Sequence, residues 1–248
     1  MDEQEIISRW RAEEAQPFEG WDFSYLRGRY SEDRPSFSYE GIVRAHLKNA
    51  DAVLDMGTGG GEKLLEFKDV LPDYVFATEG YPPNIPVAKA NLEPHGIQVV
   101  AYDVSTDPVM PFADACLPLV INRHEAYDAD EIARILTPGG VFVTQQVDGY
   151  DLADLRQILN LPLEYTHVTL DNCRTQLERV GLNVEQAYDW SGYATFADVA
   201  ALVYFLRAIM PETFSVDRHV EALLLLHRWQ KPLRFAIKRF LLLARKPA

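Results

Sequence analysis

The sequence has few cysteines and no long apolar run, and each shortage excludes a class of protein. Its 248 residues include two cysteines, Cys116 and Cys173, which are too few and too far apart for a disulfide framework or a metal site. No apolar run approaches the roughly 20 residues that span a bilayer, and the start of the chain is too acidic for a signal peptide. We therefore expect a cytoplasmic protein with no membrane partner, with Cys116 in its core.

The chain is also short of positive charge. It has 24 lysines and arginines against 37 aspartates and glutamates, a formal net charge of -13. Such a chain repels a phosphate backbone unless its basic residues gather on one face. Seven basic residues do lie between Arg228 and Lys246 without an acid among them, but no RNA-binding module accompanies them. This stretch is either a solvated C-terminal face or a nucleic-acid site, and nucleic acid is the less favoured partner.

A glycine-rich turn between residues 50 and 67 organises the chain. The apolar residues before it predict a buried strand, and those after it predict a helix over about 62–70. Four glycines remove every Cβ from the loop, which lets a ligand approach the main chain closely. The turn is either structural or binds a nucleotide. A dinucleotide fingerprint begun at Gly57 fits poorly, because Glu62 stands where that motif needs a small residue.

The acid and glycines of this turn resemble the first motif of class I S-adenosylmethionine-dependent methyltransferases. That motif is an acid, any residue and then G-x-G-x-G, and Asp55, Gly57, Gly59 and Gly61 match it in register. The resemblance implies that these residues, with Thr58 between them, bind S-adenosyl-L-methionine.

Two further acids follow predicted strands. Glu79 ends the second one, 20 residues after Gly59, where it and Gly80 can face the ribose hydroxyls of a bound nucleoside. An exposed acid in a turn is the alternative for Glu79. Asp103 follows the third predicted strand, and the resemblance implies that it accepts a hydrogen bond from the adenine amino group, with Val104 in apolar contact.

Polar residues also follow the fourth predicted strand, residues 117–121. Asn122, Arg123 and His124 fall at its carboxyl end, where ligands bind in open parallel sheets. The resemblance implies cofactor contacts for Asn122 and Arg123. His124 has a pKa suited to taking a proton from a methyl acceptor, so it is a candidate general base. Alternatively, its neighbours Arg123 and Glu125 could bind or orient the acceptor, and a histidine at a helix start can also cap or pack. Methyl transfer needs no metal, and none is expected.

Aromatic residues of the N-terminal arm are candidates for binding the methyl acceptor. The resemblance suggests that an arm ahead of the first motif folds over the cofactor, and ordinary packing is the alternative. The candidates are Trp21, Phe23 and Tyr39, together with Gln145 at the end of a fifth predicted strand, which could equally be a hydrogen-bonded core amide. Residues 191–232 form a predicted helical pair, which is either a lid over the acceptor or a dimer surface.

The resemblance implies a Rossmann-like α/β fold. Its sheet has seven mostly parallel strands in the order 3-2-1-4-5-7-6, with the seventh antiparallel and helices on both faces. We expect a single domain over residues 1–248, made of a cap (1–49), a cofactor-binding core (50–190), a helical insertion (191–232) and a closing strand (233–248). The expected function is methyl transfer (EC 2.1.1.-) to a small molecule, by a monomer or homodimer. An RNA or protein methyltransferase and a non-catalytic adenosylmethionine-binding protein are the alternatives.

Overall fold

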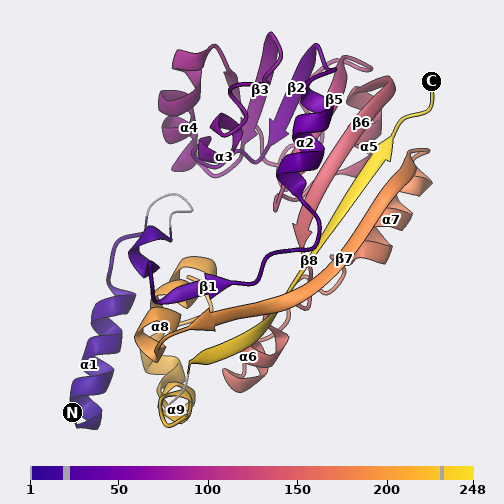
Figure 1. The fold of residues 1–248 in the computed structure, drawn as a ribbon. Coiled ribbons are helices and arrows are strands. Elements are labelled where there is room, and N and C mark those ends of the chain that lie inside the picture. The colour runs from indigo at the N-terminus through magenta and orange to yellow at the C-terminus, as the bar shows by residue number, and fades with distance from the viewer. Residues whose placement is uncertain (1, 19–22, 230–231) are drawn as a thin grey trace. The chain divides into compact units, whose positions relative to one another are not determined.

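The computed structural model describes residues 2–18, 23–229 and 232–248 (Figure 1). The chain divides into two compact units. One contains Met1–Pro35, Tyr150–Tyr165 and Ser191–Lys238, and the other contains Ser36–Gly149, Thr166–Trp190 and Arg239–Ala248. The second unit carries the glycine-rich turn and therefore positions the candidate site. The single domain with four segments that we expect from the sequence stays a prediction.

The strands form one mixed sheet of the expected class. Its members are β1 (Tyr30–Glu32), β2 (Ala52–Met56), β3 (Tyr74–Glu79), β4 (Gln98–Ala101), β5 (Leu117–Arg123), β6 (Leu136–Val147), β7 (Asn183–Phe196) and β8 (Leu233–Arg245). Their order in the sheet is β1-β7-β8-β6-β5-β2-β3-β4, with β8 antiparallel to β6. Numbered from β2, this is the expected 3-2-1-4-5-7-6 order. The sequence missed β1, which pairs with β7 as an eighth strand, because three residues are too few for a periodic signal.

Alternation along β2 separates two apolar layers in the second unit. Val53 points to one face of the sheet, where it packs with α2 (Tyr39–Leu47), α3 (Glu62–Leu65) and α4 (Asn84–Leu92), the last followed by a short 3-10 turn at Glu93–His95. Leu54 points to the other face, against α5 (Ala129–Ile135) and α7 (Leu170–Arg179). Because both faces are covered, the parallel strands are buried and only their ends are left for a ligand.

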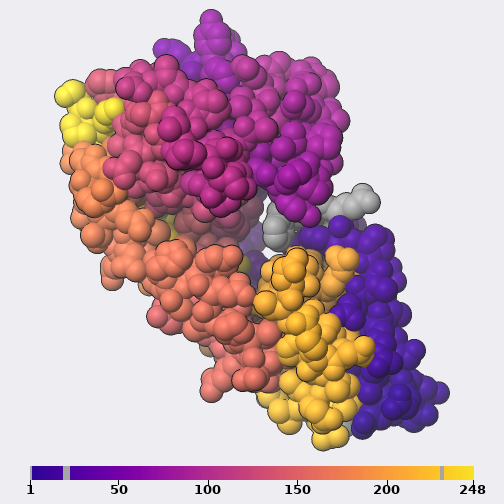
Figure 2. Space-filling view, turned by 180° about the vertical axis from the view of Figure 1, so that it is seen from behind, coloured from indigo at the N-terminus to yellow at the C-terminus, as the bar shows by residue number. Residues whose placement is uncertain are grey.

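The first unit is built around an almost wholly buried helix. This helix, α8 (Val199–Ile209), is covered by α1 (Glu3–Glu14) and α9 (Val216–His227), and Figure 2 shows the indigo N-terminal segment against the yellow-orange segment of α9. A short 3-10 helix (Ser24–Leu26) and α6 (Ala153–Ile158) complete the helices of the unit. Arg29 joins its parts by ion pairs with Glu13 and Asp198, at 3.0 and 3.2 Å.

Several boundaries differ from the expected ones. The helix expected over 62–70 ends at Leu65, because the next residues donate hydrogen bonds to carbonyls three positions back and form tight turns. The strand expected over 117–121 runs on to Arg123, which makes Asn122 and Arg123 strand residues. The prediction that Cys116 lies in the core is wrong: it lies just before β5 and is exposed.

Two long strands also extend beyond their predicted ends. The expected turn at residues 137–140 belongs to β6, because Gly139 and Gly140 exchange main-chain hydrogen bonds with Lys246 just beyond the end of β8. The sixth predicted strand, 183–190, continues to Phe196 as β7, so the helical pair begins only after it. None of the helices in the described part of the chain is long and apolar enough to cross a membrane.

The start of α7 offers a test of the local structure. The Thr169 hydroxyl accepts a hydrogen bond from the Asn172 N–H at 3.3 Å, as a helix N-cap does. Replacing Thr169 by Ala should lower the free energy of unfolding by about 1 kcal/mol. The matched control is Thr175→Ala on the exposed side of the same helix, which should not lower it because alanine is the better helix former. Equal urea midpoints for the two variants would contradict the assignment.

Candidate functional site

The glycine-rich turn presents bare main chain at the carboxyl end of β2. Gly57, Gly59 and Gly61 have φ values of 63°, 63° and 88°, which favour glycine. A Cβ on Gly61 would lie 2.6 Å from Cγ of Leu92, and one on Gly57 would lie 2.5 Å from Oε2 of Glu125. Side chains are therefore excluded at Gly57 and Gly61 both by backbone conformation and by close neighbours.

Glu79 ties the turn to the end of β3. Its side chain is buried, and Oε2 accepts a hydrogen bond from the Gly59 N–H at 2.7 Å while Oε1 accepts one from the Tyr81 N–H at 2.8 Å. Each carboxylate oxygen has two lone pairs, so these two bonds leave acceptor capacity for a pair of hydroxyls. The alternative of an exposed turn acid is excluded by this burial and bonding.

Gly80 and Asp103 are close neighbours at the ends of β3 and β4. A Cβ on Gly80 would lie 3.0 Å from Cα of Asp103. The Asp103 Oδ1 accepts hydrogen bonds from the Ser105 N–H and hydroxyl at 2.8 and 2.6 Å, and these bonds lower the pKa of Asp103. Val104, beside it, is half-buried against the apolar layer that contains Leu54. Asp103 is therefore an ionised acceptor next to apolar surface, which suits an amino-purine edge.

Asp55 is buried on β2, two residues before Gly57, and lies close to Tyr39 of α2. Removal from water raises the pKa of Asp55 to about 7; the positive charge of Arg123 opposes this shift and the negative charge of Glu79 adds to it. Burial also raises the pKa of Tyr39, and the charge of Asp55 adds to that shift. Tyr39 is thus a core residue of the second unit, and the acceptor contact expected for it stays a prediction.

A buried amide network holds the end of β5. The Asn122 Oδ1 accepts hydrogen bonds from the Thr144 hydroxyl at 3.1 Å and from the Gln146 amide at 2.8 Å. The amide groups of Asn122 and Gln146 both donate to the main-chain carbonyl of Glu125, at 3.1 and 2.8 Å. Asn122 is fully buried. The structure therefore engages Asn122 in positioning the loop after β5, and its expected cofactor contact stays a prediction.

His124 begins that loop with a positive φ of 66°. The side-chain amide of Gln145 donates to His124 Nε2 at 2.9 Å, and the His124 N–H donates to the Gln145 carbonyl at 2.8 Å. Desolvation by the surrounding protein, together with the positive charges of Arg123, Arg239 and Lys63, lowers the pKa of His124 well below its usual value. The imidazole is therefore neutral near pH 7 and a weak base, and its basic nitrogen, Nε2, can take a proton only when the Gln145 amide releases it.

Glu125 is a residue for which the sequence suggested only that, with Arg123, it could bind or orient the acceptor in place of a base role for His124. Burial, with the negative charges of Glu79 and Asp103, raises the pKa of Glu125 to about 7. Its carboxyl group lies beside Gly57 on a different strand end. No spacing rule connects positions 57 and 125. The only signal in the sequence was that Glu125 follows a strand that ends in polar residues.

The remaining acceptor candidates do not all fall in this unit. Trp21 lies outside the described residues. Phe23 belongs to the first unit, where its ring contacts those of Phe18, Tyr30 and Phe205 at centroid distances of 5.1, 6.3 and 5.4 Å. These contacts show ordinary packing for Phe23, which was the alternative to an acceptor-binding role for the N-terminal arm. Its acceptor role stays a prediction.

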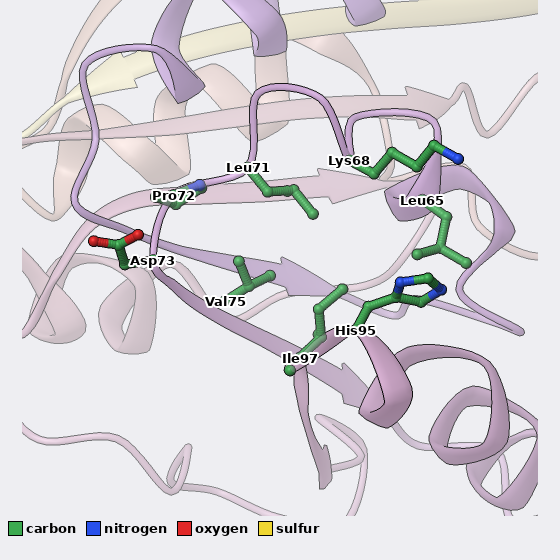
Figure 3. Close-up of a pocket in the computed structure, with 9 residues that line it drawn as sticks. Leu65, Lys68, Leu71, Pro72, Asp73, Val75, His95 and Ile97 are labelled. Atoms are coloured by element: carbon green, nitrogen blue, oxygen red, sulfur yellow. The ribbon is translucent and has the colours of Figure 1, made fainter.

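A small pocket lies at the opposite end of the strands from the glycine turn. It has a volume of about 280 Å³, and Figure 3 shows Val75, from the start of β3, and Ile97, from just before β4, in its wall. Lys68 and His95 also line it. Because Glu79 marks the other end of β3, this pocket is separate from the candidate site. The described residues contain no group of three or more His, Cys, Asp or Glu side chains that could hold a metal ion.

Comparisons with known proteins agree with this architecture. Residues 54–144 match a family described as a methyltransferase domain. No curated protein sequence matches the chain. A Bacillus halodurans protein, provisionally named a methyltransferase, superposes with a TM-score of 0.61 at 18% identity, over 84% of this chain and 97% of its own.

Two other solved structures with a similar fold are a methyltransferase and a cyclase. A SAM-dependent methyltransferase from Methanosarcina mazei has a TM-score of 0.55 at 13% identity, over 85% of this chain and 99% of its own. The [4+2]-cyclase SpnF has a TM-score of 0.55 at 15% identity, over 89% and 86%. At such identities the likeness concerns the fold. Residues 54–144 thus match a methyltransferase domain, and their strands lie in a sheet with the order expected for the class I S-adenosylmethionine-dependent methyltransferases.

The amide network at the end of β5 leads to a stability prediction. Asn122→Ala would leave the buried Thr144 hydroxyl without its acceptor and remove one of the three acceptors of the Gln146 amide, at an expected cost of about 1 to 3 kcal/mol. Asn49→Ala is the matched control in the same unit, because Asn49 is exposed. Denaturant unfolding of both variants measures the difference, and similar free energies would show that the network is dispensable.

Proposed function

We propose that this protein binds S-adenosyl-L-methionine across the carboxyl ends of β4, β3 and β2 and transfers its methyl group to a small molecule. The observation that carries the proposal is the Glu79 carboxylate. It is buried, it fixes the glycine turn through Gly59, and it retains acceptor capacity for two hydroxyls. A ribose offers such a pair of hydroxyls.

The other residues of the site fit a nucleoside joined to a cationic amino acid. In the proposed arrangement, Asp103 and Val104 receive the adenine, Glu79 and Gly80 the ribose, and the main chain from Gly57 to Gly61 the methionine portion. Asp55, buried below the turn, supplies negative charge on the side of the methionine ammonium group. The glycines of the turn, which carry no Cβ, give the close approach that this mode of binding needs.

Methyl transfer depends more on the placement of the acceptor than on reactive groups of the protein. When bound, the cofactor supplies an electrophilic methyl group on its sulfonium centre. The chain's own contribution is then to hold the acceptor atom in line with that methyl group, which can supply most of the rate. His124 is neutral near pH 7 and lies at the end of β5. We retain it as the proposed group that takes a proton from a hydroxyl or ammonium acceptor.

Charge favours a small acceptor over RNA. The basic stretch near the C-terminus is largely occupied within the chain: Arg245 pairs with Glu185 at 2.6 Å, and Arg234 with Asp33 at 3.6 Å. The ammonium group of Lys246 donates to two main-chain carbonyls, at 2.6 and 2.8 Å. Partners of this kind leave little of the stretch for phosphates, and the chain carries a net charge of -13.

Calorimetry with adenosylmethionine and NAD tests the cofactor. The protein should bind adenosylmethionine and not NAD. Glu79→Gln should weaken binding by about 1 to 3 kcal/mol, because one acceptor oxygen is replaced by a donor facing an N–H. Glu93→Gln, on the exposed surface, is the matched control and should bind like the wild type. Heat with NAD and none with adenosylmethionine would refute the proposal. Thermal unfolding of each variant separates lost contacts from lost structure.

Filter binding of total RNA tests the acceptor class. An acidic chain with a small acceptor should hold RNA weakly and without sequence preference, since it lacks the electrostatic attraction that dominates nucleic-acid affinity. The measurement is made at physiological salt, with yeast tRNA as a second probe. Submicromolar binding there would point to an RNA acceptor instead.

A further inference from the structure

A carboxyl group faces the glycine turn from the loop after β5. Glu125 lies two residues beyond the end of β5, and its Oε2 fills the space beside Gly57. The position of this carboxyl group does not depend on the flexible side chain alone. Its main chain is anchored at the carbonyl of Glu125 by the buried amides of Asn122 and Gln146. The anchored backbone therefore presents the carboxyl group to the turn.

The strand order places Glu125 at the sulfur end of the proposed ligand. Asp103 follows β4 and Glu79 ends β3, while Gly57 follows β2 and Glu125 follows β5. These strands are neighbours in that order. With adenine at Asp103 and ribose at Glu79, the ligand continues toward the ends of β2 and β5. The next part of adenosylmethionine along that line is the sulfonium centre. It falls in the region that Gly57 and Glu125 share.

We propose that Glu125 makes this site prefer a sulfonium nucleoside over the neutral thioether that remains after methyl transfer. The proposal rests on the proposed function. Adenosylmethionine and adenosylhomocysteine share the same nucleoside and amino acid groups and differ by one methyl group and one positive charge. A carboxylate beside the sulfur attracts the first ligand and has no charge to attract in the second. Glu125 would thus favour loading of the methyl donor and release of the product.

The protonation of Glu125 makes the proposal pH-dependent. Burial, then Glu79 and Asp103, raise the pKa of Glu125 to about 7, while the Ala126 N–H opposes the shift. Other ionisable groups around this site include Tyr39 and Glu40 on α2, Asp55 on β2, Glu62 and Lys63 on α3, and Arg123 and His124 at the end of β5. The Glu62 carboxyl group lies beside Gly60, and Lys63 forms ion pairs with Glu40 and Glu66. The positive charge of Arg123 opposes the rise in the pKa of Asp55 and lowers the pKa of His124.

The sign of the effect follows from that pKa. Glu125 is uncharged below about pH 7 and charged above it, so the preference for adenosylmethionine should grow as pH rises through 7. Binding of the cation lowers the pKa of the carboxyl group, which loses its proton to the buffer. Asp55 also titrates near 7, but both ligands carry the same ammonium group. Its contribution is therefore expected to cancel in the ratio of the two affinities.

Titration calorimetry of the full chain with each ligand tests this. Dissociation constants are measured at pH 6, 7 and 8, in phosphate and in Tris, whose different ionisation heats report the protons released. In the wild type the ratio of affinities, adenosylmethionine over adenosylhomocysteine, should rise with pH. Glu125→Gln should lower affinity for adenosylmethionine about tenfold at pH 8 and that for adenosylhomocysteine less than about threefold. It should also reduce the proton release.

Two further variants keep the outcome clear. Glu125→Asp keeps the charge and should keep most of the preference, whereas Glu93→Gln on the surface should change nothing. Equal losses for both ligands in Glu125→Gln, or a ratio that does not depend on pH in the wild type, would overturn the role of Glu125 and leave the proposed function standing. Failure of the wild type to bind either ligand would instead refute the proposed function.

Discussion

The hydrogen bonds from two loops to the Glu79 carboxylate are the interaction on which the rest of the site depends. One bond comes from Gly59 in the turn after β2, and the other from Tyr81 after β3. Parallel neighbouring strands bring these loops together, but they do not fix the distance between them. A buried carboxylate with two main-chain donors does fix it, because leaving either donor unpaired would cost free energy. The open glycine turn and the acceptor at its edge are consequences of the same contact.

The end of β5 is organised by a different device. Asn122, Thr144 and Gln146 have their polar atoms joined to one another, in a place where the surrounding layer is apolar. Such a buried network is stable only when its members are satisfied, so it holds one arrangement of the loop that follows. That loop carries His124 and Glu125. The network thus controls the position of two ionisable groups without itself being near the protein surface.

Four acidic residues lie along the edge of the sheet that carries the glycine turn and the end of β5. Asp55, Glu79, Asp103 and Glu125 lie at the ends of neighbouring strands or in the loops that follow them, while several of the chain's basic residues are held in ion pairs elsewhere. Removal from water and the nearby charge of Glu79 raise the pKa values of Asp55 and Glu125 to about 7. A site of this kind is poorly suited to a phosphate-rich ligand and well suited to one with positive charge. This agrees with the methyltransferase domain that residues 54–144 match.

The sequence by itself determined the strand, turn and helix around Gly57, and the spacing to Glu79, because these features are local or follow from parallel pairing of successive strands. It also determined the order of seven strands, through the family that the turn resembles. Only the tertiary structure decided what Asn122 does, since its partners Thr144 and Gln146 come from another strand. The same holds for Glu125, whose side chain lies beside Gly57 although the two residues are 68 positions apart in the sequence. It also holds for β1, whose three residues are too few for a periodic pattern and which is recognised as a strand only by its pairing with β7. Side-chain partners from distant segments leave no periodic trace in a single sequence, so they are visible only after the chain has folded.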